Sequence, residues 1–302
     1  MSQTSPSLRT ESDEALLAEE EAHATPAKSR LHLSWSGWLG VIVVGLIGVL
    51  AIIGPYISPY DEADIIKIGG FALPDRQMLL GADYLGRDML SRLLWGTRLT
   101  IGLSFSATII AYLIGVILGI VAALDRHWID IGLSRLNDAL LSLPNIMLGL
   151  LVIAAFGSSI PVLLLSTGVI YATGVFRIAR SLGQDIMVMD FVEVAQARGE
   201  GVMWIVMREI LPNAIIPLAT DFGIRFVYII IFVSSLSFLG LGVQPPAADW
   251  GSMVRENLIG LAQGSIAPLM PALAIGIVTI AANLIVDDVS AKAGGALAEK
   301  MV

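Results

Sequence analysis

Six apolar runs, each of about 20 residues, constrain this chain more than any other feature of its sequence. They cover residues 38–57, 99–124, 139–156, 160–178, 214–241 and 266–286. A helix needs about 20 apolar residues to cross roughly 30 Å of hydrocarbon, so each run predicts one membrane crossing. The chain is 56% hydrophobic and 15% charged, with a mean hydropathy of +0.80, which argues against a soluble domain. We therefore expect an all-α, multi-pass membrane protein with six transmembrane helices.

The positions of lysine and arginine predict how these helices are oriented. Six crossings place both termini on the same side of the membrane, and cytoplasmic loops carry an excess of Lys and Arg. With both termini in the cytoplasm, more of these residues lie inside than outside. The bias favours cytoplasmic termini, although the first outer loop, which runs to residue 98, is itself rich in arginine.

The apolar runs and the segments between them predict how the chain is divided. Residues 1–30 are rich in Glu, Ser, Thr, Pro and Ala, which predicts a disordered, acidic cytoplasmic tail. Residues 31–98 are expected to hold the first transmembrane helix, an extracytoplasmic loop and an interfacial helix. Residues 99–287 are expected to form a five-helix core with a cytoplasmic loop at 181–212, and residues 288–302 a second cytoplasmic tail.

Several classes of site are excluded by the composition and the motifs. The chain has no cysteine, so it has no disulfide, thiol nucleophile or thiolate metal ligand. Its net charge of −8 argues against nucleic acid as a partner. It has no G-x-x-x-x-G-K-[ST] loop to bind ATP and no H-E-x-x-H, and its three histidines are scattered. We expect no catalytic residue, cofactor or metal site of its own.

Small residues on the second apolar run predict close helix packing. Gly102, Gly115 and Gly119 lie on this run, the last two at the spacing of a small-x-x-x-small motif. Small side chains let helix backbones approach each other in lipid. We therefore expect these three glycines at helix contacts.

The segment between the fourth and fifth runs is charged and interrupted by glycine. It has the pattern E-x-A-x-x-x-G followed by I-L-P, and its marked residues are Glu193, Ala195, Gly199, Gly201, Leu211 and Pro212. Both glycines are expected to break the segment, because glycine alone takes positive φ freely. Pro212 is expected to begin the next helix. The prediction is a helix–turn–helix that fits a groove in another protein, the alternative being an amphipathic helix resting on the bilayer.

A second charged segment ends the first outer loop. Its marked residues are Asp83, Gly86, Arg87, Asp88, Ser91 and Arg92. Because Asp88 and Arg92 lie four residues apart, we expect an interfacial helix whose arginines face lipid headgroups or water. Trp95 and the later Trp250 are expected to anchor at the membrane interface, where amphipathic rings are favoured.

The fifth run contains two charged residues, Asp221 and Arg225, which can pair along one helix face. A charge near the middle of a span costs roughly 2.5–3.5 kcal/mol, so such residues face protein or a water-filled cavity. They are candidates for the translocation path or for a contact with another membrane subunit. The alternative is a self-neutralising pair that fixes the rotation of the helix.

These motifs resemble one family of membrane proteins. The Glu193–Gly199 pattern with I-L-P resembles the cytoplasmic loop of ATP-binding-cassette (ABC) importer permeases. The segment 81–92 resembles the G-T-D-x-x-G-R-D-x-x-S-R signature of the second membrane subunit of dipeptide and oligopeptide permeases, with Ala82 in place of Thr. Residues 236–251 are similar to the L-S-F-L-G-L-G-x-x-P-P-x-x-x-W-G run of that family. The resemblance covers residues 81–287.

The resemblance implies a type I ABC importer permease fold, similar to that of MetI, in the inner (plasma) membrane. It implies that the loop 181–212 contacts the ATPase subunits through Glu193 and Gly199, where Val194 and Glu200-Gly201 depart from the usual residues of the family. The implied partners are a homologous permease, two ABC ATPase subunits that bind ATP and Mg, an extracytoplasmic substrate-binding protein and the lipid bilayer. The implied cargo is a peptide or a peptide-like solute. A secondary transporter, an intramembrane enzyme and a non-transporting signalling component remain as alternatives.

Overall fold

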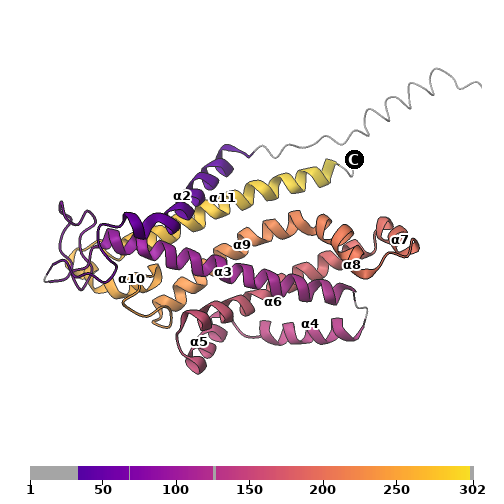
Figure 1. Cartoon of the computed structure of the whole chain (residues 1–302), viewed down its shortest axis with the longest axis horizontal. Coiled ribbons are helices and arrows are strands. Elements are labelled where there is room, and N and C mark those ends of the chain that lie inside the picture. The colour runs from indigo at the N-terminus through magenta and orange to yellow at the C-terminus, as the bar shows by residue number, and fades with distance from the viewer. Residues whose placement is uncertain (1–32, 68, 125–126, 300–302) are drawn as a thin grey trace, which may run out of the picture. The chain divides into compact units, whose positions relative to one another are not determined.

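The structure is a computed structural model that describes residues 33–67, 69–124 and 127–299. The acidic tail predicted for residues 1–30 lies outside these residues. Within them the secondary structure is helical, with two isolated β-bridges, as the sequence predicts. In order, the elements are α2 (Trp35–Ile57), α3 (Met89–Leu124), α4 (Trp128–Leu141), α5 (Asn145–Phe156), α6 (Ile160–Met187), α7 (Asp190–Ala197), α8 (Val202–Ile205), the π-helical turn η1 (Val206–Ile210), α9 (Leu211–Phe238), α10 (Trp250–Asn257), the 3-10 turn η2 (Leu258–Gln263) and α11 (Leu269–Glu299) (Figure 1).

In this described part, five helical stretches are long and apolar enough to cross a membrane, and a bent pair makes a sixth if it is counted as one span. The five are Trp35–Ile57, Met89–Leu124, Ile160–Met187, Val202–Phe238 and Leu269–Lys292. The bent pair is α4 with α5, whose axes differ by 88°. The crossings predicted from the apolar runs are therefore present, but the third is broken.

Helices α3 and α6 run side by side in the same direction. A Cβ added to Gly115 would lie 2.5 Å from the Val175 side chain, and one added to Gly119 would lie 2.7 Å from the Phe176 carbonyl oxygen. The packing role predicted for these two glycines is confirmed. The prediction for Gly102 is wrong, because a Cβ there would meet no atom within 4 Å. Since α3 and α6 are parallel, the chain must return between them, and α4 with α5 makes that return.

The break in the third span has a local cause. Helix α4 ends at Leu141, and Pro144 is the residue before α5, with φ −58° and ψ 134°. Proline lacks the amide donor that a continuing helix needs and disfavours helical backbone at the residue before it. The single helix expected over 139–156 therefore becomes two helices joined at residues 142–144.

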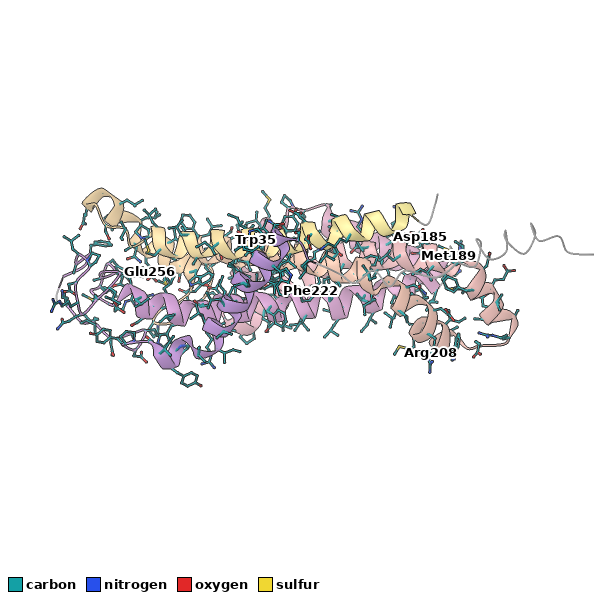
Figure 2. The ribbon with its side chains drawn as sticks, turned by 90° about the horizontal axis from the view of Figure 1, so that it is seen from above. Trp35, Asp185, Met189, Arg208, Phe222 and Glu256 are labelled. Carbon is teal, nitrogen blue, oxygen red and sulfur yellow. The ribbon has the colours of Figure 1, made fainter. Side chains whose placement is uncertain are left out.

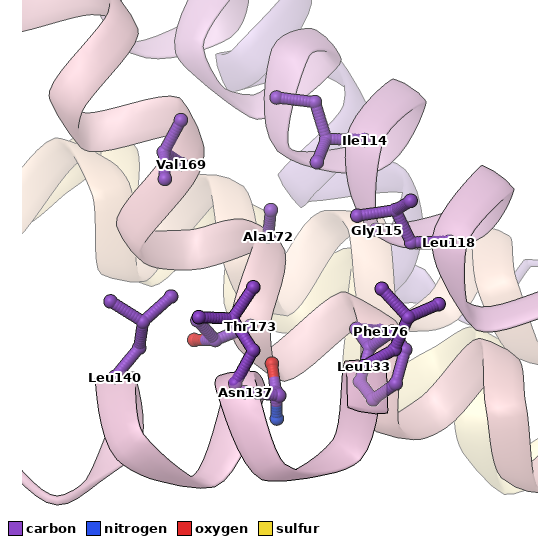
Figure 3. A pocket seen from close by; sticks show the side chains of 11 residues that line it. Ile114, Gly115, Leu118, Leu133, Asn137, Leu140, Val169, Ala172, Thr173 and Phe176 are labelled. Carbon is purple, nitrogen blue, oxygen red and sulfur yellow. The ribbon is translucent and has the colours of Figure 1, made fainter. Parts of the chain in front are cut away.

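Helix α4 packs along α6 in the opposite direction. The Arg180 guanidinium on α6 donates to Asp130 at the start of α4, with Nη2 2.6 Å from Oδ2. Further along, the two helices and α3 enclose a cavity of about 160 Å³ (Figure 3). Asn137 and Thr173 are the polar residues on its wall, and the Asn137 Nδ2 has no hydrogen-bond partner among the described residues. The contact between α4 and the core is thus less tightly packed than that between α3 and α6.

The first and last described helices form an antiparallel pair. The Ser34 amide before α2 donates to the Asp288 carboxylate at 3.1 Å, and a Cβ on Gly40 would lie 2.5 Å from the Ala281 carbonyl oxygen. Helix α11 is also antiparallel to α9, because Gly223 meets Val286, whereas Ser235 near the end of α9 lies beside Ala272 near the start of α11. The start of α2, the end of α11 and the start of α9 therefore share one end of the helix array, called here the α7 end (Figure 1). The opposite end, with the loop 58–88, is called the α10 end.

Candidate functional site

The segment between α6 and α9 projects beyond the neighbouring helices at the α7 end; Figure 2 labels Met189 and Arg208 in it. Helix α7 turns Val192 and Ala195 inward, and both side chains are fully buried. Val192 belongs to an apolar cluster with Ile186, Ile205 and Ile210, which anchors the segment to the ends of α6 and α9. Glu193 faces outward and is exposed. The carboxylate predicted to contact another protein thus lies on a helix anchored by buried side chains and is open to solvent.

The turn after α7 is a Schellman C-cap that requires glycine. The Glu200 amide donates to the Ala195 carbonyl at 3.1 Å, and the Gly199 amide donates to the Gln196 carbonyl at 2.9 Å. Gly199 has φ +82°, in the left-handed region that residues with a Cβ disfavour. The predicted break at Gly199 is confirmed, while its contact with an ATPase subunit stays a prediction. Gly201 also lies in the break, directly before α8, but not through positive φ, because its φ of −77° and ψ of 159° are open to any residue.

Pro212 lies in the first turn of α9, as the sequence predicts, but α9 does not start afresh there. Helices α8, η1 and α9 form one continuous stretch from Val202 to Phe238. Just before Pro212 the ladder widens to a π-turn, in which the Leu211 amide donates to the Val206 carbonyl. Proline removes one donor from the α-helical ladder, and a π-turn beside it keeps the helix continuous through the gap. Leu211 and Pro212 therefore lie within a helix that links the projecting segment directly to α9.

Large apolar side chains remain exposed on the projecting segment. They are Val188, Met189, Phe191, Val194, Val202, Met203 and Met207. The Arg198 guanidinium lies 5.8 Å from the centre of the Trp204 ring, a cation–π contact that ties the turn to α8. Exposed apolar side chains gathered within a charged rim are typical of a contact surface. This set, with Glu193 beside it, is the candidate docking surface.

The charged segment at the α10 end is buried rather than interfacial, so the prediction for its arginines is wrong. The Asp83 Oδ2 accepts from Arg87 Nε at 2.6 Å and from Arg92 Nη1 at 2.9 Å. Both guanidinium groups also reach Glu256 Oε2 on α10, at 3.2 and 3.3 Å. Asp83 and Arg92 are 0% exposed, and Arg87 is 3% exposed. Burial raises the pKa of Glu256, and the nearby Arg87 opposes that shift.

Asp88 and Ser91 shape the start of α3. The Asp88 Oδ2 accepts from the Ser91 amide at 2.8 Å and from the Ser91 hydroxyl at 2.6 Å, so Asp88 caps the helix and does not pair with Arg92. Helix α3 begins at Met89, which means that the predicted interfacial helix and the second span are one helix. Gly86 has φ +87°, and a Cβ there would lie 2.0 Å from the Lys67 carbonyl oxygen. Glycine is therefore required at this position.

Trp250 is not an interface anchor, which corrects the sequence prediction. It is 2% exposed, its indole packs on Gly96, and its Nε1 donates to the Leu93 carbonyl at 3.2 Å. Its neighbour Asp249 caps α10 by accepting from the Ser252 amide at 3.0 Å. Together these contacts fix α10 against α3, and so position Glu256 for the arginine cluster.

Asp221 and Arg225 do pair, with the Arg225 Nε 3.2 Å from both carboxylate oxygens. The Tyr112 hydroxyl on α3 also donates to Asp221. The Arg225 guanidinium lies against Gly174 on α6, where a Cβ would be 2.4 Å from Nη1. The pair thus lies between α3, α6 and α9. Sequence reasoning missed Tyr112 and Gly174, because nothing in a single sequence relates them to α9.

The architecture is that of a helical membrane protein with a broken third crossing and a projecting segment before α9. A family model described as "Binding-protein-dependent transport system inner membrane component" matches residues 115–290, more than half of the chain. The chain belongs to this family of ABC importer permeases. This confirms the predicted family and supports a transport permease over a secondary transporter, an intramembrane enzyme or a signalling component.

Curated relatives and a solved structure agree with this membership. The chain is 31% identical over 253 residues to the glutathione transport system permease protein GsiD of Pectobacterium atrosepticum, covering 82% of each protein. It is 28% identical over 254 residues to the di/tripeptide transport system permease protein DppC of Pseudomonas aeruginosa, covering 82% of this chain and 84% of that one. The structure of the MetNI methionine ABC transporter in inward-facing conformations aligns with a TM-score of 0.52 and 18% identity, over 67% of this chain and 97% of that one. At that identity the structural likeness shows the fold alone.

Proposed function

We propose that this chain is one of two permease subunits in an ATP-driven importer of peptides or peptide-like solutes in the inner (plasma) membrane. The relatives described above are permeases of glutathione and di/tripeptide transport systems, which supports this class of cargo. The observation that carries the proposal is the projecting segment, whose Schellman turn at Gly199 leaves Glu193 outward beside exposed apolar side chains. This surface docks on an ATPase subunit.

The energy for transport comes from partner proteins. A homologous permease completes the translocation path, two ABC ATPase subunits bind ATP and Mg, and an extracytoplasmic binding protein delivers the solute. Within the coupling loop, residues 181–212, Glu193 contacts the ATPase subunit, and the buried Ala195 lies on the inner face of α7. Gly199 sets the turn, and Gly201 precedes α8 in a backbone conformation that any residue can adopt, while Leu211 and Pro212 lie where α8 and η1 run into α9.

The continuity of α8, η1 and α9 suits this segment to act as a lever. A displacement of the docked segment by closing ATPases moves a helix that carries Asp221 and Arg225 on its central part. Because Tyr112 on α3 and Gly174 on α6 contact this pair, the motion reaches both of those helices. The pair therefore lies where the core helices would rearrange between inward-facing and outward-facing states.

Replacing Gly199 by Val tests the coupling role. Valine resists the left-handed backbone, so the turn must rearrange at a cost on the order of 1–3 kcal/mol and misplace Glu193. We expect Gly199→Val to lose most of the uptake and of the ATPase activity stimulated by binding protein and solute in the reconstituted complex. Gly201→Ala is the matched control, because its extended backbone accepts any residue and a Cβ there meets no atom within 4 Å. Equal uptake and equal co-purification of the ATPase in both variants would contradict the coupling role.

Cysteine labelling tests the orientation, and the chain offers no native cysteine as background. Arg76 lies exposed in the loop 58–88, and Val188 is 83% exposed at the α7 end. We expect Arg76→Cys to react with a membrane-impermeant maleimide in spheroplasts, and Val188→Cys to react only after the membrane is opened. The reverse pattern would place the projecting segment outside the cell and remove it from the ATPases.

A further inference from the structure

A cavity of about 400 Å³ lies at the α10 end, between α3, the start of α6 and two loops. Its wall includes two charged residues, Glu62 and Arg98, and the apolar residues Trp95, Leu99 and Leu164. This volume lies within the range of small-molecule sites, which are mostly apolar with a few placed polar groups. The same open space explains why a Cβ on Gly102 would meet no atom.

Two opposite charges line this cavity without neutralising each other. Glu62 is half-buried, and its only hydrogen bond given by the described residues uses Oε2, which accepts from the Ala248 amide at 2.6 Å. Burial, reinforced by the charge of Asp61, raises the pKa of Glu62, while the Ala248 amide and Arg87 act in the opposite direction. Arg98 is exposed on α3, and no ion pair or hydrogen bond joins its guanidinium to any described residue. Arg87 and Arg92 do not line this cavity, and their charges are matched by ion pairs with Asp83.

We propose that this cavity is a binding site for a small zwitterionic peptide at the outer mouth of the translocation path, with Glu62 binding the terminal ammonium and Arg98 the terminal carboxylate. A guanidinium offers a planar pair of donors to a carboxylate, and a carboxylate accepts from an ammonium through charge-assisted hydrogen bonds. Between the two charges, Trp95, Leu99 and Leu164 supply an apolar surface for side chains of varied shape. The site therefore recognises the two charged ends of a peptide and accepts side chains of varied shape.

This inference rests on the proposed function, because a peptide reaches the outer mouth only in an importer with its binding protein facing that side. The ends of a phosphatidylethanolamine headgroup carry the same two charges, so a lipid is the competing source of this chemistry. The two sources differ in the carboxylate, which only the peptide has, and in solubility. Binding of either ligand can be measured directly on the purified complex, independently of transport.

The experiment is protection of a single cysteine from a small maleimide in the detergent-purified complex without binding protein. Ser106→Cys on α3 and Ile160→Cys on α6 are two independent reporters, because both positions line the cavity and are exposed in this chain. Labelling is read on this chain by mass spectrometry, with trialanine as the probe. We expect trialanine to slow labelling at both reporters, and N-acetyl-trialanine, trialanine amide and glycerophosphoethanolamine to protect far less.

Charge-removing variants test the two assigned residues. Losing one charge-assisted contact is expected to raise the half-protecting concentration of trialanine about tenfold in Glu62→Gln and in Arg98→Gln. Asp75→Asn and Arg76→Gln are the matched controls, since each removes the same charge from an exposed residue outside the cavity, and they should leave protection unchanged. N-acetyl-trialanine should protect the Glu62→Gln complex as poorly as it protects the unmodified one, because it lacks the ammonium that Glu62 binds.

Each other outcome overturns the assignment. Unprotected labelling at both reporters, protection that survives in both charge variants, or protection by glycerophosphoethanolamine alone would remove the peptide site. Failure of either cysteine to react would show that the cavity is filled in the assembled complex, with the same consequence. A wild-type complex that transports peptide but shows no protection overturns only this inference, whereas a complex without ATP-driven uptake overturns the proposed function.

Discussion

Asp83→Asn is expected to destabilise the α10 end by about 3–5 kcal/mol, the cost of leaving a buried charge unmatched. Asp83 and Glu256 oppose Arg87 and Arg92 in a buried cluster, and these four charges sum to zero. Removing one carboxylate leaves two guanidinium groups with Glu256 alone. We expect the apparent Tm of the purified complex to fall on the order of 10 °C. Limited proteolysis should then cut the loop 58–88 more rapidly.

A second substitution shows whether charge balance is the cause. Asp83→Asn combined with Arg92→Met restores one carboxylate to one guanidinium, and should recover a large part of the lost Tm. The matched surface control is Asp75→Asn, which removes the ion pair with Lys67, whose side chain is 34% exposed. That pair is worth about 0–1 kcal/mol, so its loss should hardly change the Tm. A Tm for Asp83→Asn equal to that of the control would contradict the role of the cluster.

The sequence predicts the crossings well, because a span is a property of consecutive residues. Each apolar run overlaps its helix, but the runs do not reveal how far the helices extend or where they bend: α3, for example, begins at Met89, ten residues before its run. The stop at residues 142–144 is hidden because the run 139–156 is apolar apart from a few residues, among them Ser142 and Asn145 beside Pro144. The continuity from Val202 to Phe238 is hidden because a proline such as Pro212 usually marks the start of a helix. Here a π-turn directly before it keeps the helix continuous.

Among the site residues, those whose hydrogen-bond partners are near in sequence were predictable, and those whose partners are distant were not. Gly199 was predictable because its turn is closed by bonds to Ala195 and Gln196, within five residues. The burial of Arg92 could not be predicted, because its second partner, Glu256, lies 164 residues away. Without a visible partner, an arginine beside a membrane span indicates contact with lipid headgroups or water. Trp250 was misassigned for the same reason, since its acceptor is the Leu93 carbonyl on another helix. Residues whose partners are distant in sequence need the fold before their environment can be stated.

Asp221→Asn is expected to impair assembly, because it leaves the Arg225 guanidinium without its carboxylate between α3, α6 and α9. Breaking one side of a buried ion pair typically costs about 3–5 kcal/mol. The expected result is reduced yield and lower Tm of the complex, measured after purification at equal expression. Tyr112→Phe is the local control, because it removes only the hydroxyl that donates to Asp221 and leaves the ion pair in place. Its effect should be about 1 kcal/mol, the typical net contribution of one hydrogen bond.

The double variant Asp221→Asn with Arg225→Gln decides between the two roles of the pair. Each single variant leaves one buried charge without its partner, and the double variant leaves none. Assembly should therefore recover beyond the level of either single variant. If assembly recovers while uptake of trialanine stays low, the charges serve the translocation path or the rearrangement of α9 against α3 and α6. If uptake recovers with assembly, the pair only fixes the rotation of α9. Additive losses in the double variant would mean that the two side chains are not energetically coupled, despite the 3.2 Å between the Arg225 Nε and the Asp221 oxygens.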